Sequence, residues 1–324
     1  MSNAYIHHRP KPFVKWAGGK TQLLPVIEQI LPSSFSDQLS VTYIEPFVGG
    51  GAVLFYLLNK YPNISKAIIN DINPHLIHTY KAIKNHPEEL ISKLSQIQSS
   101  YSNFQNSERQ RDYFFIIREE FNKSHLSLID DAAYMIFLNR TCFNGLYREK
   151  SKGAFNVAFG KYTNPTILDE NLIRTDSRIL QKVEILQGDF SQVEDYISDG
   201  YTFMYFDPPY RPISTTANFN SYNKCSFNDT EQFRLREFYM KMNDIGCQVL
   251  LSNSDGASTD PSNTYMDDLY RDFIIHRTTA KRSISCAGSK RGPVTELLIR
   301  NYRECQGEFR QIIAPTLPLD FENQ

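Results

Sequence analysis

The stretch "VTYIEPFVGGGAVLFYLLNK", residues 41–60, decides the fold. It begins with an apolar run typical of a buried strand, passes through three consecutive glycines, and continues with apolar residues at helical spacing. The run "KAIIND" (66–71) predicts a second strand that ends in Asp71, twenty residues beyond Gly51, and residues 72–84 predict the next helix. This order of strand, glycine turn, helix and acid-ended strand predicts an open α/β sheet that binds an adenosine-bearing ligand.

The glycine turn also limits the kind of ligand. Glycines let the backbone approach a ligand closely, and Asp71 can accept hydrogen bonds from ribose hydroxyls. The spacing of "EPFVGGG" (45–51) is not G-x-G-x-x-G, so a pyrophosphate is not indicated. A ligand with an adenosine and no phosphates fits better.

A second glycine motif lies upstream. The stretch "WAGGKT" (16–21) ends like a phosphate-binding Walker loop, but Val14 stands where that loop requires its first glycine, and no apolar strand leads into it. This excludes a nucleoside triphosphatase of the Walker type. Gly18 and Gly19 indicate a tight turn, and Trp16, the single tryptophan, is expected in the core because that is the default for a lone aromatic residue.

The stretch "FMYFDPPYRP" (203–212) predicts a buried strand that ends abruptly. Proline cannot donate to a strand ladder, so pairing stops there and Asp207 is held at the carboxyl end of the strand. Asp189 and Asn253 stand at the ends of two other predicted strands. Ligands bind outside the carboxyl ends of strands in open α/β sheets, so we expect these three residues and Asp71 to converge on one crevice. The alternative for any one of them is a cap on a helix or turn.

The tetrapeptide Asp207-Pro208-Pro209-Tyr210 suits the methylation of an exocyclic amine on a nucleobase. Such an amine is a poor nucleophile because its lone pair is delocalised into the ring, so acceptors must hold the NH₂ group while a methyl donor lies in line. Asp207 offers a carboxylate, and the Pro208 carbonyl offers a second acceptor at a rigid angle. Tyr210 can stack on the face of an extruded base. A strand-ending turn is the structural alternative.

The middle of the chain differs from these α/β segments. From Pro74 to Leu138 the pattern is long, polar and helical, which indicates a helical insertion. The segment 142–165 then alternates aromatic and basic residues between glycines, which predicts an exposed hairpin or loop suited to bases and phosphates. A packed hairpin with a core of aromatic residues is the alternative. Further strands are predicted over residues 183–190, 201–210, 247–255, 273–280 and 294–302.

Charge and composition set outer limits. The net charge is −1, but basic residues concentrate over 140–161 and 277–303, as in a phosphate-facing surface with an acidic back or in two solvated faces. With 324 residues, of which 41% are hydrophobic, the chain can bury a substantial core in one large domain or two modest ones. It has no apolar run of about 18–20 residues and no signal-peptide core near its N-terminus, so we expect a cytoplasmic protein. Five cysteines without a C-x-x-C pair predict reduced thiols and no zinc site.

From about Lys11 to Tyr302 the chain resembles the Dam-like DNA adenine-N6 methyltransferases (D12 class, group alpha). The motifs that carry the resemblance, in the family's order, are "KPFVKWAGGK", "EPFVGGG", "NDIN", "REEFNKS", "LNRTCFNGLYR", "GAFNVAFGKY", "DPPY", "STTANFNSY" and "KRSIS". The resemblance implies a Rossmann-like S-adenosylmethionine-dependent methyltransferase sheet with an inserted, mainly helical target-recognition domain that carries a β-hairpin. Its domains would be a catalytic domain over 1–73 and 169–324 and a recognition domain over 74–168.

The resemblance also implies roles for individual residues, with a flipped adenine in double-stranded DNA as substrate. Arg148 would read guanine, Phe143 and Asn144 would enter or border the duplex, and Leu146 and Tyr162 would contact neighbouring bases. The catalytic residues would be Asp207, Pro208, Pro209 and Tyr210. The residues that bind S-adenosylmethionine would be Trp16, Gly18, Gly19, Lys20, Glu45, Phe47, Gly49, Gly51, Asp71, Asp189, Phe190 and Asp207. The DNA-binding residues would be Arg140, Phe143, Asn144, Leu146, Arg148, Ala158, Lys161, Tyr162 and Asn218.

Members with this hairpin commonly methylate GATC, which we therefore expect here, although Ala158 stands where many relatives have proline beside the recognised bases. The alternatives are another adenine-containing site, a methyltransferase of an RNA base or a glutamine amide, and a DNA-binding module without catalysis. RNA and glutamine methyltransferases usually begin the tetrapeptide with Asn and lack the insertion. We expect no metal and no membrane partner, and a cognate restriction endonuclease that acts in the same system without direct contact.

Overall fold

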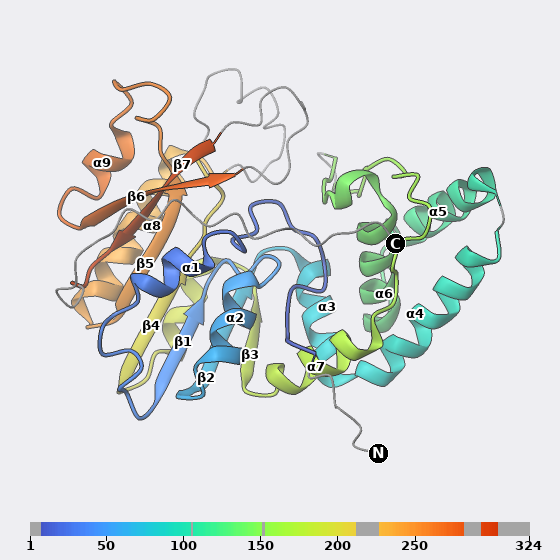
Figure 1. Cartoon of the computed structure of the whole chain (residues 1–324), viewed down its shortest axis with the longest axis horizontal. Helices are drawn as coiled ribbons and strands as arrows, with labels where there is room; N and C mark the ends of the chain where they lie inside the picture. Colours follow the sequence, from blue (N-terminus) through green and yellow to red (C-terminus); the bar gives the residue numbers. More distant parts are fainter. Residues whose placement is uncertain (1–7, 105, 151–152, 212–226, 282–292, 304–324) are drawn as a thin grey trace, which may run out of the picture. The chain divides into compact units, whose positions relative to one another are not determined.

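The computed structural model describes residues 8–104, 106–150, 153–211, 227–281 and 293–303 (Figure 1). It contains a seven-stranded sheet with the order β3-β2-β1-β4-β5-β7-β6. The strands are β1 (Val41–Glu45), β2 (Ile64–Asp71), β3 (Val183–Gln187), β4 (Tyr201–Phe206), β5 (Gln248–Ser254), β6 (Ile274–Lys281) and β7 (Pro293–Arg300). The predicted α/β sheet is therefore confirmed.

Strand direction changes across this sheet. β1 pairs in parallel with β2 and with β4, and β4 pairs in parallel with β5. β7 is antiparallel to both β5 and β6. β4 is buried along nearly its whole length because it has a parallel neighbour on each side, and Phe203, Met204, Tyr205 and Phe206 are fully buried. The predicted strand over 203–206 is thus a central strand, and it stops at Asp207.

The helices follow capping and periodicity signals. They are α1 (Leu24–Gln29), α2 (Ala52–Lys60), α3 (Pro74–Asn85), α4 (Pro87–Ser102), α5 (Ser107–Phe121), α6 (Leu128–Thr141), α7 (Glu170–Leu180), α8 (Asp229–Asp244) and α9 (Tyr265–Leu269), with 3-10 turns η1 (Phe143–Gly145) and η2 (Phe190–Tyr196). Sequence analysis placed α2 and the helical middle correctly but left α7 and α8 unassigned. The side chains of their N-cap residues, Asp169 and Asn228, each accept a hydrogen bond from the backbone N–H of the third residue of the helix, and such an N-cap residue is the signal that could have found them.

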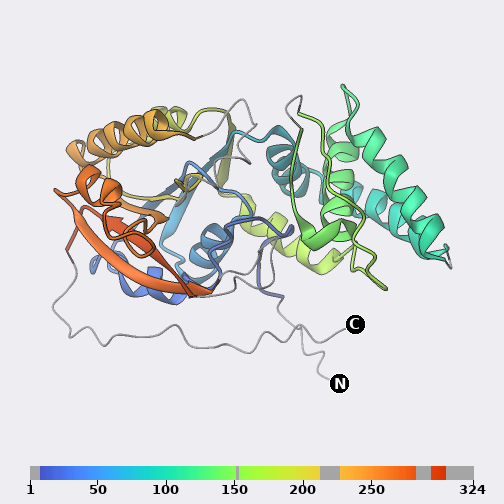
Figure 2. The ribbon, with the colours of Figure 1, turned by 90° about the horizontal axis from the view of Figure 1, so that it is seen from above.

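The chain divides into two compact units. Unit 1 comprises Met1–Gly19, Gly49–Pro62 and Asp71–Gly188, and unit 2 comprises Lys20–Val48, Asn63–Asn70 and Asp189–Gln324. In unit 1, α6 packs against α3, α4 and α5 (Figure 1). It is buried on nearly every side, which includes the polar residues Asp131 and Asn139. In unit 2, α8 packs against β5 (Figure 2).

The segment after α6 is more packed than an exposed hairpin. Its arms meet at only two described bridges, Cys142 with Phe159 and Glu149 with Phe155. Phe155, Val157 and Phe159 are buried, while Ala158 between them is exposed. Asn122, the residue directly after α5, exchanges hydrogen bonds with the backbone of Phe155 in place of a strand partner. Both sequence interpretations hold in part, because one face of the arm is core and the other faces solvent.

Among the described residues, no helix is long and apolar enough to span a bilayer, and no group of His, Cys, Asp or Glu side chains is placed to hold a metal ion. Cys142 and Cys247 are buried free thiols, and the other three cysteines lie outside the described residues.

Candidate functional site

Asp207 lies at the carboxyl end of β4, and one of its two carboxylate oxygens has hydrogen-bond partners. Its Oδ1 accepts Lys20 Nζ at 2.9 Å and the Ser252 hydroxyl at 2.9 Å. No residue in the described part of the chain donates to Oδ2. Burial raises the pKa of Asp207, and Lys20 and then Ser252 lower it without cancelling that rise. The carboxylate is therefore fixed in place through one oxygen, and the other has no donor in the described part of the chain.

The two prolines after Asp207 differ in what their carbonyls do. The Pro209 carbonyl accepts Gln232 Nε2 at 3.2 Å. The Pro208 carbonyl has no donor among the residues described here. Two acceptors of successive residues, Asp207 Oδ2 and the Pro208 carbonyl, thus have no donor among the described residues, at the end of a buried strand.

Arg211 fixes the far side of this loop. Its guanidinium makes two hydrogen bonds to the Asp229 carboxylate, at 2.7 and 3.1 Å, and lies over the Tyr265 ring. Its N–H donates to Asn253 Oδ1 at 3.4 Å, and its carbonyl accepts the Ser254 hydroxyl at 2.8 Å. Asn253 therefore supports the end of the loop that begins at Asp207. The convergence of Asp71, Asp189, Asp207 and Asn253 on one crevice stays a prediction.

Tyr210 is half-buried between charged groups. Its hydroxyl donates to Glu296 Oε2 at 2.6 Å, and Lys20 Nζ lies 4.6 Å from the ring centroid. Burial raises the pKa of Tyr210 well above its usual value, and the neighbouring carboxylates of Asp207 and Glu296 add to that rise. Sequence analysis missed Glu296, which stands in a strand far along the chain and belongs to no recognisable motif.

In unit 1, Asp71 organises the glycine turn. Its Oδ2 accepts the Gly49 N–H at 3.0 Å and its Oδ1 accepts the Asn73 N–H at 2.9 Å. Burial raises the pKa of Asp71, and these backbone donors lower it. Each carboxylate oxygen keeps a lone pair that can accept a ligand hydroxyl.

Gly49 and Gly51 adopt positive φ values, +49° and +76°, in that turn. A Cβ on Gly49 would lie 2.9 Å from the Trp16 ring, so Trp16 packs directly on the glycine. Trp16 is only half-buried and stacks on Tyr147 with centroids 5.2 Å apart, so it is not the core residue that a lone tryptophan is by default. Its contact with the cofactor, which the resemblance implies, stays a prediction. The turn after Trp16 has the predicted tight form, with Gly18 at φ +80° and the Gly19 N–H donating to the Trp16 carbonyl.

Three rings of unit 2 form an aromatic cluster that includes two predicted cofactor residues. Phe47 lies 5.3 Å from Phe190 and 5.8 Å from Phe227, between ring centroids. The neighbouring Asp189 is already engaged, because both of its oxygens accept from Arg234 and one also accepts from Ser191. These bonds, led by the one from Arg234, hold the pKa of Asp189 well below its usual range.

Glu45, also predicted to bind the cofactor, is buried at the end of β1. Its Oε2 accepts the Tyr43 hydroxyl at 2.7 Å.

The predicted DNA-binding residues of the segment 142–162 are held by its backbone while their side chains face solvent. Phe143, Asn144, Arg148, Ala158 and Lys161 are exposed, and Asn144 and Lys161 adopt positive φ values. Arg148 Nε donates to Asn156 Oδ1 at 2.8 Å, which orients the guanidinium.

The same segment holds side chains with less freedom. The Asn144 N–H donates to the Tyr162 hydroxyl at 3.0 Å, and Leu146 is half-buried with its carbonyl close to the Cys142 thiol. Arg140 is half-buried and donates to the Phe13 carbonyl at 2.8 Å, and burial lowers its pKa. It therefore braces the chain before Trp16.

Lys15 is a further exposed cation that sequence analysis did not select. Its Nζ lies 5.5 Å from the centroid of the Tyr162 ring, among the predicted base-contacting residues. Asn139 fixes its backbone by exchanging hydrogen bonds with the Lys15 N–H and carbonyl, both at 2.8 Å. The signal available in the sequence was its position immediately before the "WAGGK" motif.

Other predicted features contribute less. Asn218 and the motifs "STTANFNSY" and "RSIS" lie outside the described residues. In the second basic segment Arg277 is paired with Asp255 and Asp267, and Arg300 is buried. These two arginines therefore do not supply the free cations expected of a phosphate-facing surface.

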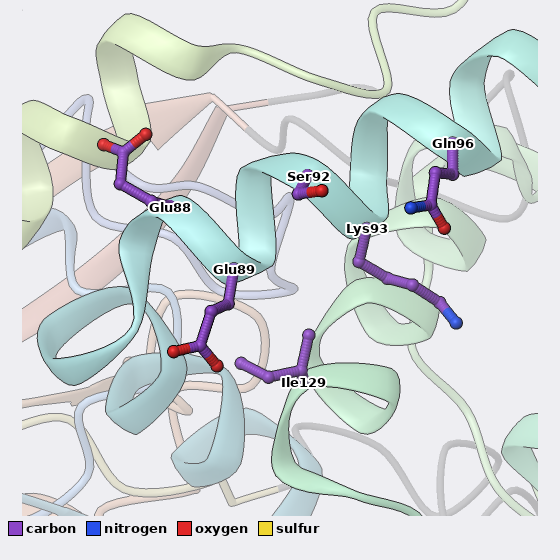
Figure 3. Close-up of a pocket in the computed structure, with 6 residues that line it drawn as sticks. All are labelled: Glu88, Glu89, Ser92, Lys93, Gln96 and Ile129. Atoms are coloured by element: carbon purple, nitrogen blue, oxygen red, sulfur yellow. The ribbon is translucent and has the colours of Figure 1, made fainter.

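Unit 1 carries two surface cavities. One, of about 490 Å³, lies between α4 and α6 and is lined by Glu88, Glu89, Ser92, Lys93, Gln96 and Ile129 (Figure 3). Its Lys93 is paired with Asp130 at 2.6 Å. The other, of about 270 Å³, is lined by Arg118, Glu119, Asn122, Lys150, Ala154, Phe155 and Asn156. Neither contains a residue predicted to bind the cofactor or to act in catalysis.

Comparison with known proteins gives consistent matches. The family described as D12 class N6 adenine-specific DNA methyltransferase matches residues 16–284. The chain is 45% identical to the type II methyltransferase M.MjaIII of Methanocaldococcus jannaschii, over 90% of this chain and 99% of that protein. It is 38% identical to the type II methyltransferase M1.LlaDCHI of Lactococcus lactis subsp. cremoris, over 90% and 95%. It is 34% identical to the DNA adenine methylase of Salmonella typhi, over 89% and 94%.

The glycine turn gives a stability prediction. Gly51→Ala should lower the free energy of unfolding by about 2–5 kcal/mol, because its φ of +76° is strained for alanine and the new Cβ would clash with the buried Tyr80 hydroxyl. Gly246→Ala is the matched control, because its φ is +92° but nothing lies within 4 Å of the new Cβ, so it should cost only about 1–2 kcal/mol. Urea unfolding measures both. If both variants lost the same free energy of unfolding, the clash with Tyr80 would contribute nothing.

Proposed function

Because the chain belongs to the D12 class N6 adenine-specific DNA methyltransferase family, we propose that it transfers a methyl group from S-adenosylmethionine to N6 of an adenine extruded from duplex DNA, within the sequence GATC. The observation that carries the proposal is the Asp207 carboxylate, which Lys20 and Ser252 fix through one oxygen while the other has no donor among the described residues. The Pro208 carbonyl, which also lacks a described donor, belongs to the next residue in the chain.

The described residues fit S-adenosylmethionine. The Gly49–Gly51 turn has the positive φ values and the lack of Cβ atoms that a closely approaching ligand needs, and Asp71 keeps lone pairs for the two ribose hydroxyls. The aromatic cluster of Phe47, Phe190 and Phe227 suits an adenine ring. When bound, S-adenosylmethionine supplies the methyl group, so that the N6 lone pair forms the N–C bond as the S–C bond breaks and N6 then releases one proton.

The protein's part in the reaction is to hold and polarise the amine. Asp207 Oδ2 and the Pro208 carbonyl each accept one N6 hydrogen, which directs the nitrogen lone pair away from the base plane. Ionised Asp207 also stabilises the positive charge that develops on N6. Tyr210 stacks on the base, and an adenine inside a duplex could not reach this pair of acceptors without leaving the stack.

DNA recognition is assigned to the domain over 74–168, and catalysis to residues 1–73 and 169–324. Arg148 is exposed and oriented by Asn156, as an arginine that makes two hydrogen bonds to guanine must be. Phe143 is half exposed beside Asn144, which suits entry into the space that an extruded adenine leaves. A restriction endonuclease of the same system would share the recognition sequence without contacting this chain, and the protein would act in the cytoplasm.

The proposal predicts the following assay result. Incubated with labelled S-adenosylmethionine, the protein should transfer label to N6 of adenine in a GATC duplex and not to a duplex with the site scrambled. Transfer of label to a duplex with another adenine-containing site, such as GATATC, and not to GATC would support the adenine methyltransferase activity but reject GATC as its recognition sequence. Label only on RNA or on a glutamine-containing peptide would support the rival substrates, and absence of transfer would support a binding module.

Asp207→Asn should lower the single-turnover rate of transfer by at least about a hundredfold, because the amide keeps the shape but loses the charge that holds the amine. Asp195→Asn, an exposed aspartate on η2, is the control and should leave the rate unchanged. Far-UV circular dichroism checks that both variants fold. A rate within threefold of wild type for Asp207→Asn would remove Asp207 from the mechanism.

Arg148→Ala should relax discrimination at the outer guanine by about 1–3 kcal/mol, measured as the ratio of kcat/KM values for GATC and for duplexes with that guanine replaced. Lys150→Ala, exposed in the same segment, is the control. It should weaken binding to all duplexes alike and leave the ratio unchanged. If Arg148→Ala left the ratio unchanged, Arg148 would not be the residue that recognises the outer guanine.

Activity should fall on acidification at a higher pH than an ordinary aspartate would cause. Asp207 must be ionised to accept the amine, and burial raises its pKa while Lys20 lowers it. Lys20→Met removes that lowering, so the acid limb of the single-turnover rate should move to still higher pH. Ser252→Ala should move it in the same direction by less, since Ser252 contributes the smaller lowering. If the single-turnover rate of Lys20→Met fell at the same pH as that of the wild type, ionisation of Asp207 would not control the acid limb.

A further inference from the structure

The Tyr210 ring is held by two charged side chains from distant parts of the sequence. Its hydroxyl donates to Glu296 Oε2 at 2.6 Å. Lys20 Nζ lies 4.6 Å from its ring centroid and 2.9 Å from Asp207 Oδ1. All four residues belong to unit 2.

These two contacts restrain different torsions of the tyrosine. The hydroxyl lies on the axis about which the ring turns, so the bond to Glu296 fixes where the tip of the side chain lies but leaves the ring free to rotate. Lys20 over the ring resists that rotation, because an ammonium is attracted to the face of the ring and not to its edge. Together they fix both the direction and the plane of Tyr210.

Lys20 also decides which face of the ring is available. Its ammonium covers one face, so a base can stack only on the opposite face. The same ammonium anchors the Asp207 carboxylate. The plane of the stacking ring and the position of the amine acceptor are therefore set by one cation.

Glu296 reaches Tyr210 because of the antiparallel end of the sheet. In β7 it lies in register opposite Ser254 of β5, the residue whose hydroxyl holds the Arg211 carbonyl in the same loop. The Tyr210 hydroxyl remains a donor over the working pH range, since burial and the carboxylates of Asp207 and Glu296 raise its pKa. Thus β5 and β7 together support a loop that β4 delivers.

We propose that Glu296 is a positioning residue for methyl transfer, which holds the Tyr210 ring in the orientation that stacks the target adenine against the two acceptors. This inference rests on the proposed function. It assigns to β7 a role that the Asp207-Pro208-Pro209-Tyr210 motif by itself does not contain.

The test is a double-mutant cycle between Glu296 and Tyr210. Glu296→Thr suits a strand but is too short to reach the hydroxyl, Glu296→Gln keeps an acceptor, and Tyr210→Phe removes the donor. Single-turnover transfer to a GATC duplex is measured for each variant and for Glu296→Thr/Tyr210→Phe. Glu237→Ala removes an exposed glutamate on α8 and is the control. Thermal unfolding midpoints check that each variant folds.

The expected result is a loss of roughly tenfold in rate for Glu296→Thr and for Tyr210→Phe, with KM for DNA little changed. The double variant should be no slower than the slower single variant, and Glu296→Gln should stay within about threefold of wild type. A duplex with 2-aminopurine at the target position should fluoresce more strongly on Glu296→Thr than on wild type, because the base stacks less.

Several results would overturn the inference. Losses that multiply in the double variant would show that Glu296 does not act through Tyr210, and equal losses in Glu296→Gln and Glu296→Thr would exclude the hydrogen bond. If Glu296→Thr does not fold, full activity and unchanged 2-aminopurine fluorescence in Tyr210→Phe would overturn it equally. Absence of transfer by the wild-type protein would instead reject the proposed function, so the two failures are distinguishable.

Discussion

The inability of proline to donate a backbone hydrogen bond is the constraint on which the site depends. β4 is paired in parallel on both sides and buried, and Pro208 and Pro209 end its ladder within one residue of the core. Asp207 is therefore desolvated, and a desolvated carboxylate needs a partner. Lys20 and Ser252 provide it through a single oxygen. The loop gains a fixed carboxylate with one oxygen unoccupied, which a longer or more exposed turn would not give.

Unit 1 contains a second carboxylate, that of Asp71, which also needs hydrogen-bond donors. There the half-buried Asp71 carboxylate is stabilised by backbone N–H groups of the glycine turn and of the start of α3. Trp16 packs against this glycine turn. The carbonyls of Lys15 and Phe13, just before it, accept hydrogen bonds from Asn139 and Arg140 of α6. Each of the two carboxylates is thus held by neighbouring donors, side chains for Asp207 and backbone N–H groups for Asp71, which leave part of its acceptor capacity unused.

The residues of the Asp207–Tyr210 motif are held in place by other residues that belong to no motif. Glu296, Ser252 and Gln232 each bond one residue of the Asp207–Tyr210 loop, and they come from β7, β5 and α8. A family motif records the groups that meet the substrate. The supporting groups are dispersed along the chain, and they decide whether an acceptor such as the Pro208 carbonyl is open or, like that of Pro209, already taken.

The sequence by itself determined the α/β sheet, the abrupt end of β4 and the succession of helices in the middle of the chain, because apolar runs, helical periodicity, glycine and proline are local signals. It did not determine that Trp16 is half-buried or that Phe155, Val157 and Phe159 form a packed face, since burial depends on which segments meet. Nor could it identify Glu296 as the partner of Tyr210, 86 residues away. Only the antiparallel register of β5 and β7 brings that carboxylate to the loop, and pairing between distant strands is a property of the tertiary structure.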